Sequence, residues 1–262
     1  MTSSQLWGGN HEQSIIETKK LCKTFSNGGV QQHVLKNINL EIYEGDFTII
    51  MGASGAGKST LLYSLSGMDK PTLGSVSFDG TEITKMNTDE LAIFRRSHCG
   101  FVFQQVYLVE SMSVLDNIMA AGLLVYKDKN TLVKKAGDLL KAVNIDETLW
   151  NKFPTQISGG EAQRVGIARS LINDPKLVFA DEPTGALNSQ TGKAVLDTLT
   201  KFNEKGQSIV MVTHDITSAR RGNRILYVKD GEIAGECNLG KYVTGDKERH
   251  QKLNDFLATM GW

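Results

Sequence analysis

The sequence predicts an α/β fold with a mostly parallel sheet, an antiparallel β subdomain and a helical insertion subdomain. Short apolar runs alternate with helical patterns along much of the 262-residue chain, which is typical of a parallel sheet covered by helices on both faces. One apolar run, Phe47–Met51, leads into a glycine-rich stretch and then into a helix. From about residue 107 to residue 173, apolar residues recur at helical spacing and strand patterns disappear, which predicts the helical insertion.

The composition narrows the possible classes of function. Lysine plus arginine and aspartate plus glutamate both number 29, so the zero net charge gives no reason to expect nucleic acid as the main ligand. No apolar run approaches the ~20 residues that cross a bilayer, and the polar N-terminus lacks the apolar core of a signal peptide. The three cysteines are far apart and lack metal-ligand spacing, so free thiols in a reducing cytoplasm are expected.

The first hundred residues are predicted to be rich in strands. Residues 1–13 are expected to form a flexible tail, and apolar–polar alternation predicts a half-buried strand at 34–42. After the glycine-rich stretch, a helix is expected from Lys58 to about Ser66, closed by Gly67. The other elements expected here are strands at 14–22, Phe47–Met51, 74–78 and Cys99–Phe103, a turn at 25–29, a hairpin-like turn at 44–46 and a helix at 87–96.

The C-terminal half returns to strands alternating with helices, and its last residues have an amphipathic pattern that predicts a docking helix. The main domain is therefore expected at 14–236, with the helical subdomain at about 107–173, and a C-terminal extension at 237–262. The expected elements are strands at 177–180 and 208–213, a helix between them marked by Val195, Leu199 and Phe202, a hairpin of Arg224–Lys229 and 232–236, and a docking-helix face of Leu253, Phe256, Leu257 and Met260.

The glycine-rich stretch carries a phosphate-binding pattern. Residues 52–59 match G-x-x-x-x-G-K-[ST], in which backbone N–H groups of a tight loop and a helix N-terminus surround phosphate oxygens. Lys58 is expected on the β- and γ-phosphates and the Ser59 hydroxyl on Mg²⁺. The alternative is a surface loop, but such loops rarely follow a buried strand and end in Lys-Ser-Thr-Leu-Leu. The sequence thus predicts a P-loop NTPase core that binds nucleotide through Gly52, Ser54, Gly55, Ala56, Gly57, Lys58, Ser59 and Thr60.

Two carboxylates end the apolar run at 177–180. Because ligands of α/β sheets bind at the carboxyl ends of strands, Asp181 is expected to hold Mg²⁺ opposite Ser59. Glu182 is expected to polarise a water for in-line attack on the γ-phosphate. A solvated strand-to-loop turn is the alternative, and it is the weaker one beside a phosphate loop. His214 and Gln104 also follow predicted strands, so both are candidates for the same site.

A second anion site is predicted where Ser158 and Glu161 form a capping box. Gly159 and Gly160, in the first turn of the helix, each cost ~1 kcal/mol of helix stability against alanine. They leave backbone N–H groups accessible at the positive end of a helix, which can bind an anion. An ordinary capped helix is the alternative, and both descriptions can hold. The distance in sequence from Lys58 favours a role toward the phosphate loop of another subunit.

In this order, over about residues 14–236, these motifs resemble those of an ABC-transporter ATP-binding subunit. The resemblance implies ATP and Mg²⁺ as cofactors and Lys58 as part of the catalytic set. It also implies that Gln104 contacts Mg²⁺ and the attacking water, that Glu182 is the catalytic carboxylate and that His214 reaches the γ-phosphate. Phe25 is then the aromatic residue that stacks on adenine. The implied signature loop, which closes on ATP held by the other subunit, is Ser158, Gly159 and Gly160.

Two motifs depart from the family pattern. In the signature, Ile157 stands where Leu is usual and Glu161 stands where Gln is usual; Glu161 keeps the capping box, so function is expected to be intact. Asn188 stands where Asp is usual, and it keeps an acceptor oxygen but loses the charge. The change at Asn188 is expected to affect the strength of coupling between the two subunits, and not hydrolysis itself.

Within the family, residues 100–104 and 179–185 resemble the branch that contains lipoprotein-releasing, macrolide-exporting and cell-division ATPases. Residues 52–57 and the C-terminal extension resemble the Bce-type bacitracin-resistance group. This implies an ATP-sandwich dimer with a second copy and a permease docked near Val106 to Asn117. The expected location is the cytoplasmic face of a bacterial plasma membrane.

The implied function is ATP hydrolysis that drives the permease for peptide-antibiotic resistance, either by export or by release of the antibiotic from its target. A sensor histidine kinase is a further implied partner, and nucleic acid is not expected. The alternative is an ATPase of a sensing or mechanotransmission complex without net transport. The residues do not separate these two functions, because both use the same ATPase motifs.

Overall fold

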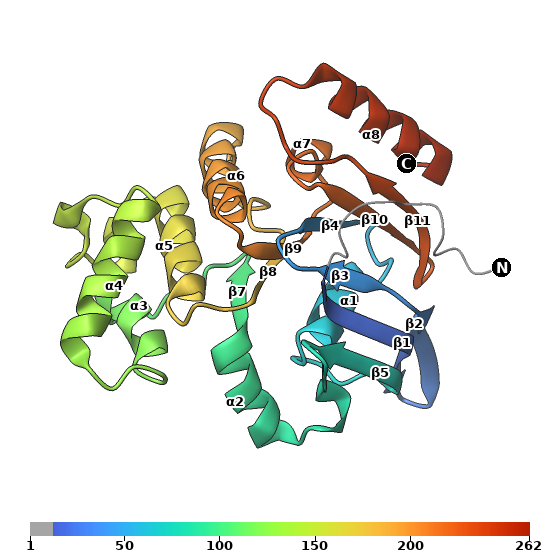
Figure 1. Cartoon of the computed structure of the whole chain (residues 1–262), viewed down its shortest axis with the longest axis horizontal. Coiled ribbons are helices and arrows are strands. Elements are labelled where there is room, and N and C mark those ends of the chain that lie inside the picture. The colour runs from blue at the N-terminus through green and yellow to red at the C-terminus, as the bar shows by residue number, and fades with distance from the viewer. Residues whose placement is uncertain (1–12) are drawn as a thin grey trace.

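A computed structural model describes residues 13–262, so nearly all of the expected N-terminal tail lies outside the described residues. The larger of the two sheets in this part has the strand order β11-β10-β4-β9-β8-β7 (Figure 1). Its neighbours pair parallel except for β10 and β11, which are antiparallel. The mostly parallel sheet is therefore confirmed. Its strands are β4 (Phe47–Met51), β7 (Cys99–Phe103), β8 (Leu177–Asp181), β9 (Ser208–Val212), β10 (Arg224–Lys229) and β11 (Glu232–Asn238).

The smaller sheet is antiparallel and has the order β2-β1-β5-β6, with β3 also paired to β1. The single strand expected at 34–42 is broken between β2 and β3. The Thr18 hydroxyl takes part in the ladder there, because it accepts from Leu40 N at 3.0 Å and donates to Ile38 O at 3.1 Å. The strands are β1 (Ser14–Asn27), β2 (Val30–Ile38), β3 (Glu41–Tyr43), β5 (Leu73–Phe78) and β6 (Thr81–Glu82).

Two turn predictions need correction. The turn expected at 25–29 is shorter, since β1 continues to Asn27 and only Gly28 and Gly29 turn, both with positive φ. The turn at 44–46 is not hairpin-like, because β3 before it and β4 after it belong to different sheets. It carries the chain from the smaller sheet into the larger one.

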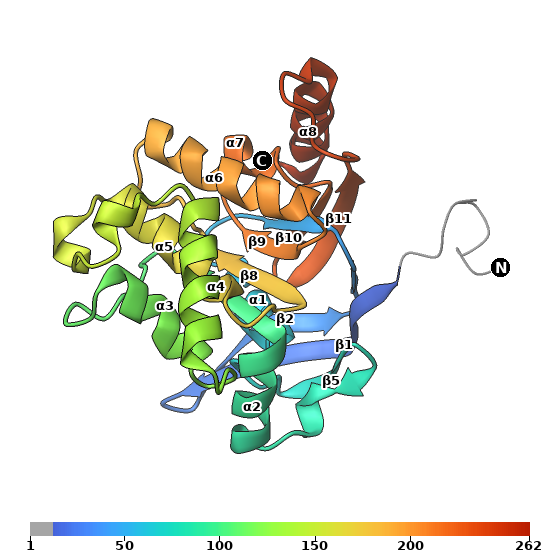
Figure 2. The same cartoon turned by 60° about the vertical axis from the view of Figure 1, so that its left-hand side comes forward.

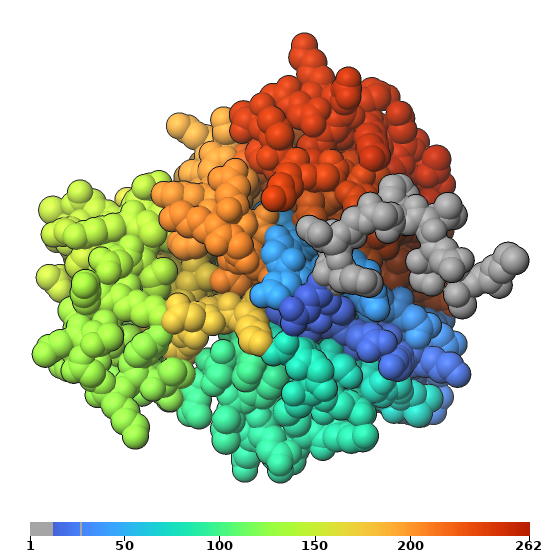
Figure 3. Space-filling view, viewed as in Figure 1, coloured from blue at the N-terminus to red at the C-terminus, as the bar shows by residue number. Residues whose placement is uncertain are grey.

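The helices cover both faces of the larger sheet and form a separate group after β7 (Figures 1 and 2). In the described residues, the segment between β7 and β8 contains helices and no strand. The space-filling view shows this segment as one flank of the molecule (Figure 3). The helices are α1 (Lys58–Leu65), α2 (Thr88–His98), α3 (Val114–Gly122), α4 (Lys129–Ala142), α5 (Gly159–Leu171), α6 (Ser189–Glu204), α7 (Ile216–Ala219) and α8 (Lys247–Met260). None of the helices in this part of the chain has the length and apolar character to cross a membrane.

The side chains of β4 point alternately to the two faces of the larger sheet, and each face borders its own hydrophobic core. Ile49 packs into a core with α5, α6 and α8, whereas Ile50 faces α1 and the smaller sheet. All five residues of β4 are buried, as expected for a central strand covered on both faces. In the C-terminal helix α8, Leu253 and Leu257 are buried against the first core. The two cores thus pack against the strands whose carboxyl ends carry the loops after β4, β8 and β9.

Candidate functional site

The loop at residues 52–57 joins β4 to α1 and touches both sheets. Gly52 has φ 148°, and a Cβ there would lie 2.1 Å from the carbonyl oxygen of Val228. Gly57 has φ 101°, and a Cβ there would lie 2.9 Å from the carbonyl oxygen of Val34. Val228 belongs to β10 and Val34 to β2. Both glycines are therefore required by the fold itself, before any ligand is considered.

Lys58 begins α1 inside this loop. Its side chain is only 7% exposed, and Nζ donates to the carbonyl oxygen of Ala53 at 2.9 Å. Burial lowers the pKa of Lys58, while the nearby carboxylates of Glu182 and Asp181 act in the opposite direction. Within the described chain, no side chain caps the N-terminus of α1. The loop therefore combines a buried ammonium group with backbone N–H groups available to an anion.

Asp181, the last residue of β8, is held by two hydroxyl groups of α1. Ser59 Oγ donates to Asp181 Oδ1 at 3.0 Å, and Tyr63 OH donates to Asp181 Oδ2 at 2.6 Å. Burial and the hydrogen bond to Asp181 raise the pKa of Tyr63. The sequence interpretation missed Tyr63, although it lies one helical turn after Ser59 and so on the same face of α1. The Ser59–Asp181 pair offers the oxygen ligands that Mg²⁺ prefers.

Glu182 and His214 come together at the ends of β8 and β9. His214 Nδ1 lies 3.0 Å from Glu182 Oε1. Glu182 has φ 46°, an uncommon conformation for a residue with a side chain, and its N–H donates to the carbonyl oxygen of Val212 at 3.0 Å. Because β9 lies between β4 and β8, this pair flanks the phosphate loop and Asp181.

Gln104 follows β7 and lies against the loop after Glu182. A Cβ on Gly185 would lie 2.7 Å from Gln104 Nε2, so glycine makes room for this amide. Two residues of α5 that the sequence interpretation missed hold the segment around Gln104. The buried Gln163 donates to Phe103 O at 2.8 Å, and Arg169 donates to the carbonyl oxygens at positions 106 and 107, at 2.6 and 2.7 Å. Gln163 stands between Ala162 and Arg164 in α5, where no local pattern indicates its partner.

The predicted capping box is present at the start of α5. Glu161 N donates to Ser158 Oγ at 3.3 Å, and Ser158 N donates to Glu161 Oε2 at 2.7 Å. The bonds from the backbone and side chain of Ser158 lower the pKa of Glu161. Ser158 and Gly159 are exposed, while Gly160 is buried beside Thr191 of α6. The structure thus places this stretch beside the start of α6 and leaves its first two residues accessible.

Asn188, the other departure from the family pattern, caps α6. Its Oδ1 accepts from Thr191 N at 2.9 Å and from Thr191 Oγ1 at 2.6 Å. An amide oxygen performs this capping role as well as a carboxylate does.

Phe25 lies on β1, next to the strand that contacts the phosphate loop. Its ring is 45% exposed, and Lys23 Nζ lies 4.9 Å from the ring centroid. Phe25 pairs with Gln32 of β2, two residues before Val34, which contacts Gly57. An accessible aromatic face therefore lies on the same strand pair as the loop contact.

Comparisons with known proteins identify the family of this chain. Residues 35–185 match the family model described as ABC transporter. The uncharacterized ABC transporter ATP-binding protein MJ1508 of Methanocaldococcus jannaschii is 46% identical, over 86% of this chain and 100% of the relative. The bacitracin export ATP-binding protein BceA of Halalkalibacterium halodurans is 37% identical, over 95% of this chain and 96% of the relative.

Two further comparisons extend the match. The macrolide export ATP-binding/permease protein MacB of Pasteurella multocida is 40% identical over 95% of this chain, which spans only 38% of that longer protein. The dimeric, ADP- and phosphate-bound structure of the MJ0796 cassette superimposes with a TM-score of 0.80 and 42% identity, over 87% of this chain and 100% of the cassette. The chain therefore belongs to the ABC transporter family, as an ATP-binding subunit that hydrolyses ATP.

Proposed function

We propose that this chain is the motor subunit of a peptide-antibiotic resistance transporter, and that ATP hydrolysis at the phosphate loop drives its permease. The catalytic part is supported by two pairs of side chains, each in contact, at the carboxyl ends of neighbouring strands. Ser59 lies 3.0 Å from Asp181, and His214 lies 3.0 Å from Glu182. Phosphoryl transfer needs positioning and charge neutralisation, and these two pairs are placed for both.

Each chemical role follows from the position of the side chain. Lys58 and the N–H groups of the loop bind the β- and γ-phosphates. Ser59 and Asp181 would hold Mg²⁺, which neutralises phosphate charge when bound. Glu182 accepts a proton from the attacking water. Since Glu182 engages Nδ1 of His214, the other ring nitrogen is the one that faces a γ-phosphate oxygen.

The second half of each ATP site comes from a second copy of the chain. Ser158 and Gly159 are exposed at the start of α5, and the backbone N–H groups there are suited to an anion. The MJ0796 cassette, which resembles this chain over its full length, forms a dimer with ADP and phosphate. We infer an ATP-sandwich dimer in which Ser158, Gly159 and Gly160 close on the partner's nucleotide.

The permease docks on residues 106–117, which follow Gln104. Tyr107 and Val109 are 62% and 47% exposed, which gives this segment an apolar surface. The segment is nevertheless firmly held, because the buried Asn117 accepts from Val109 N at 2.7 Å and donates to the carbonyl oxygen of Met112 at 3.1 Å. Because this apolar surface is fixed in place beside Gln104, it can transmit a movement of the ATP site to a permease bound at the cytoplasmic face of the membrane.

The peptide-antibiotic role is supported by the BceA comparison, since this chain and that bacitracin export protein match over nearly their whole lengths. A sensor histidine kinase is part of this proposal. Bacitracin uptake into inverted vesicles that contain the chain and its permease tests the role, with ATP-dependent uptake expected. ATP turnover stimulated by bacitracin without any uptake would instead favour the sensing function.

Glu182→Gln tests the catalytic part. Turnover should fall by about 10²–10⁴-fold because the general base is lost, while ATP binding persists and stabilises the dimer. Steady-state phosphate release and size-exclusion chromatography with ATP measure the two effects. The matched control is Glu204→Gln, which makes the same change at an exposed site at the end of α6. Normal turnover in Glu182→Gln would remove Glu182 from this role.

A further inference from the structure

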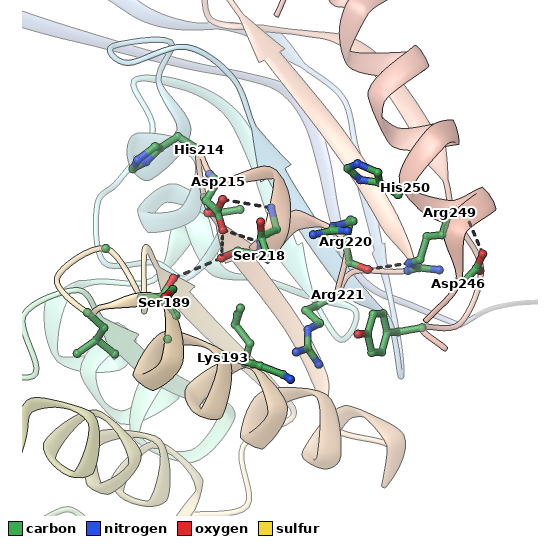
Figure 4. Close-up of a pocket in the computed structure, with 18 of the residues that line it drawn as sticks. Ser189, Lys193, His214, Asp215, Ser218, Arg220, Arg221, Asp246, Arg249 and His250 are labelled. Atoms are coloured by element: carbon green, nitrogen blue, oxygen red, sulfur yellow. Dashed lines mark hydrogen bonds between the residues drawn. The ribbon is translucent and has the colours of Figure 1, made fainter. Parts of the chain in front are cut away.

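A cleft of about 1060 Å³ opens between α6 on one side and α7 and α8 on the other (Figure 4). One end reaches Glu182 and His214, and the other reaches His250 on α8. Residues 52–60 are not among the described residues that line it. The volume slightly exceeds the roughly 300–1,000 Å³ typical of small-molecule sites. The cleft is thus a second concave surface that adjoins the catalytic face.

The walls of this cleft are tied together by two arginines. Arg221, after α7, donates to Asp197 Oδ1 of α6 at 2.6 Å and lies 4.6 Å from the ring of Tyr242. Arg249 of α8 is 3% exposed, and its Nε donates to the carbonyl oxygen of Arg220 at 2.7 Å. These contacts join α6 to α7 and α7 to α8. The cleft is therefore formed before any ligand binds, which reduces the free-energy cost of binding.

The carboxylates that line the cleft already have partners. Glu182 engages His214 at 3.0 Å. Asp215 caps α7 and accepts from Ser218 N at 2.7 Å. Asp246 caps α8 and accepts from Arg249 N at 3.0 Å. Local hydrogen bonding thus occupies all three acidic side chains of the lining.

The cationic side chains of the lining are less fully engaged. Lys193 of α6, Arg220 after α7 and Lys247 of α8 have no hydrogen bond or ion pair from their side chains to the described residues. Arg220 Nε is buried and lacks a partner in the same part of the chain. Figure 4 shows Lys193 on the α6 wall and Arg220 on the opposite wall. Three positive groups, two on helices and one directly after α7, therefore border one space, and one of them has a buried donor without an acceptor among the described residues.

We infer that this cleft binds a small polyanion, a molecule with at least two phosphate or carboxylate groups, through Lys193, Arg220 and Lys247. Apolar side chains such as Leu196 and Val243 also line the cleft, as is usual in ligand sites. Binding there does not depend on the proposed catalytic role of Glu182. If binding in the cleft were to change ATP turnover by way of His214, that effect would rest on the proposed function.

Calorimetric titration of the full chain tests the site. Saturating ADP and Mg²⁺ first fill the phosphate loop, and the probes are then inorganic pyrophosphate and citrate. We expect saturable binding of at least one probe, weakened at least about tenfold in Arg220→Gln and in the double variant Lys193→Gln/Lys247→Gln. Lys134→Gln, the same charge change at an exposed site on α4, should bind like the unchanged protein.

The outcomes separate the sources of the anion and the competing explanations. Binding of pyrophosphate alone assigns a phosphate ligand, and binding of citrate alone assigns a carboxylate ligand. Absence of saturable heat up to about 1 mM, or equal affinity in all variants, would overturn the inference. Binding that is lost in Lys58→Ala but retained in the lysine double variant would place the anion at the phosphate loop and overturn it too. The double variant changes exposed residues, so the test stands even if Arg220→Gln does not fold.

Discussion

The phosphate loop (residues 52–57) and the signature stretch (Ser158, Gly159 and Gly160) both have glycines at the start of a helix, but the structure accounts for these glycines differently. Gly52 and Gly57 have positive φ, and a Cβ on either would approach a backbone carbonyl oxygen within 3 Å. Gly159 has no such strain, and the nearest atom to its Cβ would be Leu187 Cδ2 at 3.6 Å, an ordinary contact. The fold therefore explains Gly52 and Gly57, whereas no contact with the described residues requires glycine at position 159.

The two regions also differ in burial. Lys58 is 7% exposed and lies near the carboxylates of Asp181 and Glu182. Ser158 and Gly159 are exposed, and Ser158 has its hydrogen bonds within the capping box. The loop is thus largely built within one chain, whereas Ser158 and Gly159 are accessible, as their proposed role toward a second copy requires. Three predictions test this difference.

The largest effect is expected for Gly52→Ala. The added methyl would clash with the Val228 carbonyl in a conformation that residues with a Cβ rarely adopt, so the free energy of unfolding should fall by about 3 kcal/mol. Urea denaturation without nucleotide measures this loss. Gly206→Ala is a control for strain alone, because its φ is 98° but a Cβ there meets no atom within 4 Å. Equal losses in both variants would mean that the clash contributes nothing.

An opposite pattern is expected for Gly159→Ala. Stability should stay the same or rise by up to about 1 kcal/mol, because alanine favours the helix and has room. ATP turnover should nevertheless fall by about tenfold or more, since a methyl group on this exposed surface blocks close approach of the partner's nucleotide. Phosphate release and urea denaturation on the same preparation separate the two effects. Unchanged turnover would contradict the cross-subunit role of this stretch.

The smallest effect is expected for Glu161→Gln at different pH values. Because the hydrogen bonds from Ser158 hold the pKa of Glu161 below its usual value, its charge stabilises the folded state above the unfolded pKa of about 4.3. That contribution disappears as the pH falls through the folded pKa. The unfolding free energies of the two proteins should therefore differ by less than about 1 kcal/mol at pH 7 and converge in acid. A difference that grows below pH 4 would refute this linkage.

Strand prediction succeeded where a short apolar run lies in the larger sheet. The strands Phe47–Met51 and Cys99–Phe103 have the predicted bounds. The first is buried throughout, and the second, at the edge of the sheet, is buried except at the half-buried Phe101 and Phe103. The strand at 34–42 was interrupted by a hydroxyl from Thr18, some twenty residues away. The prediction of a hairpin-like turn at 44–46 was wrong. Turn-forming residues indicate that the chain changes direction, but they do not indicate which sheet the next strand joins.

The site residues that were missed share one property, namely distant partners. Tyr63 bonds to Asp181, 118 residues further along the chain, and Gln163 bonds to Phe103, 60 residues before it. A lone glutamine inside a helix carries no pattern that reveals such a partner, and for Tyr63 the one local signal was its position a helical turn after Ser59. The predicted residues belonged instead to local motifs, in which a few neighbours set both the conformation and the chemistry.

The sequence by itself determined the α/β class, the phosphate loop, the capping box and the carboxylates at strand ends, because these depend on local backbone geometry and on hydrophobic periodicity. Tertiary structure alone decided which strand ends lie side by side. It thereby brought Asp181 to Ser59 and Glu182 to His214. It also joined α6, α7 and α8 around a cationic cleft. The order of strands in a sheet results from packing between segments far apart in the chain, and no local pattern records that order.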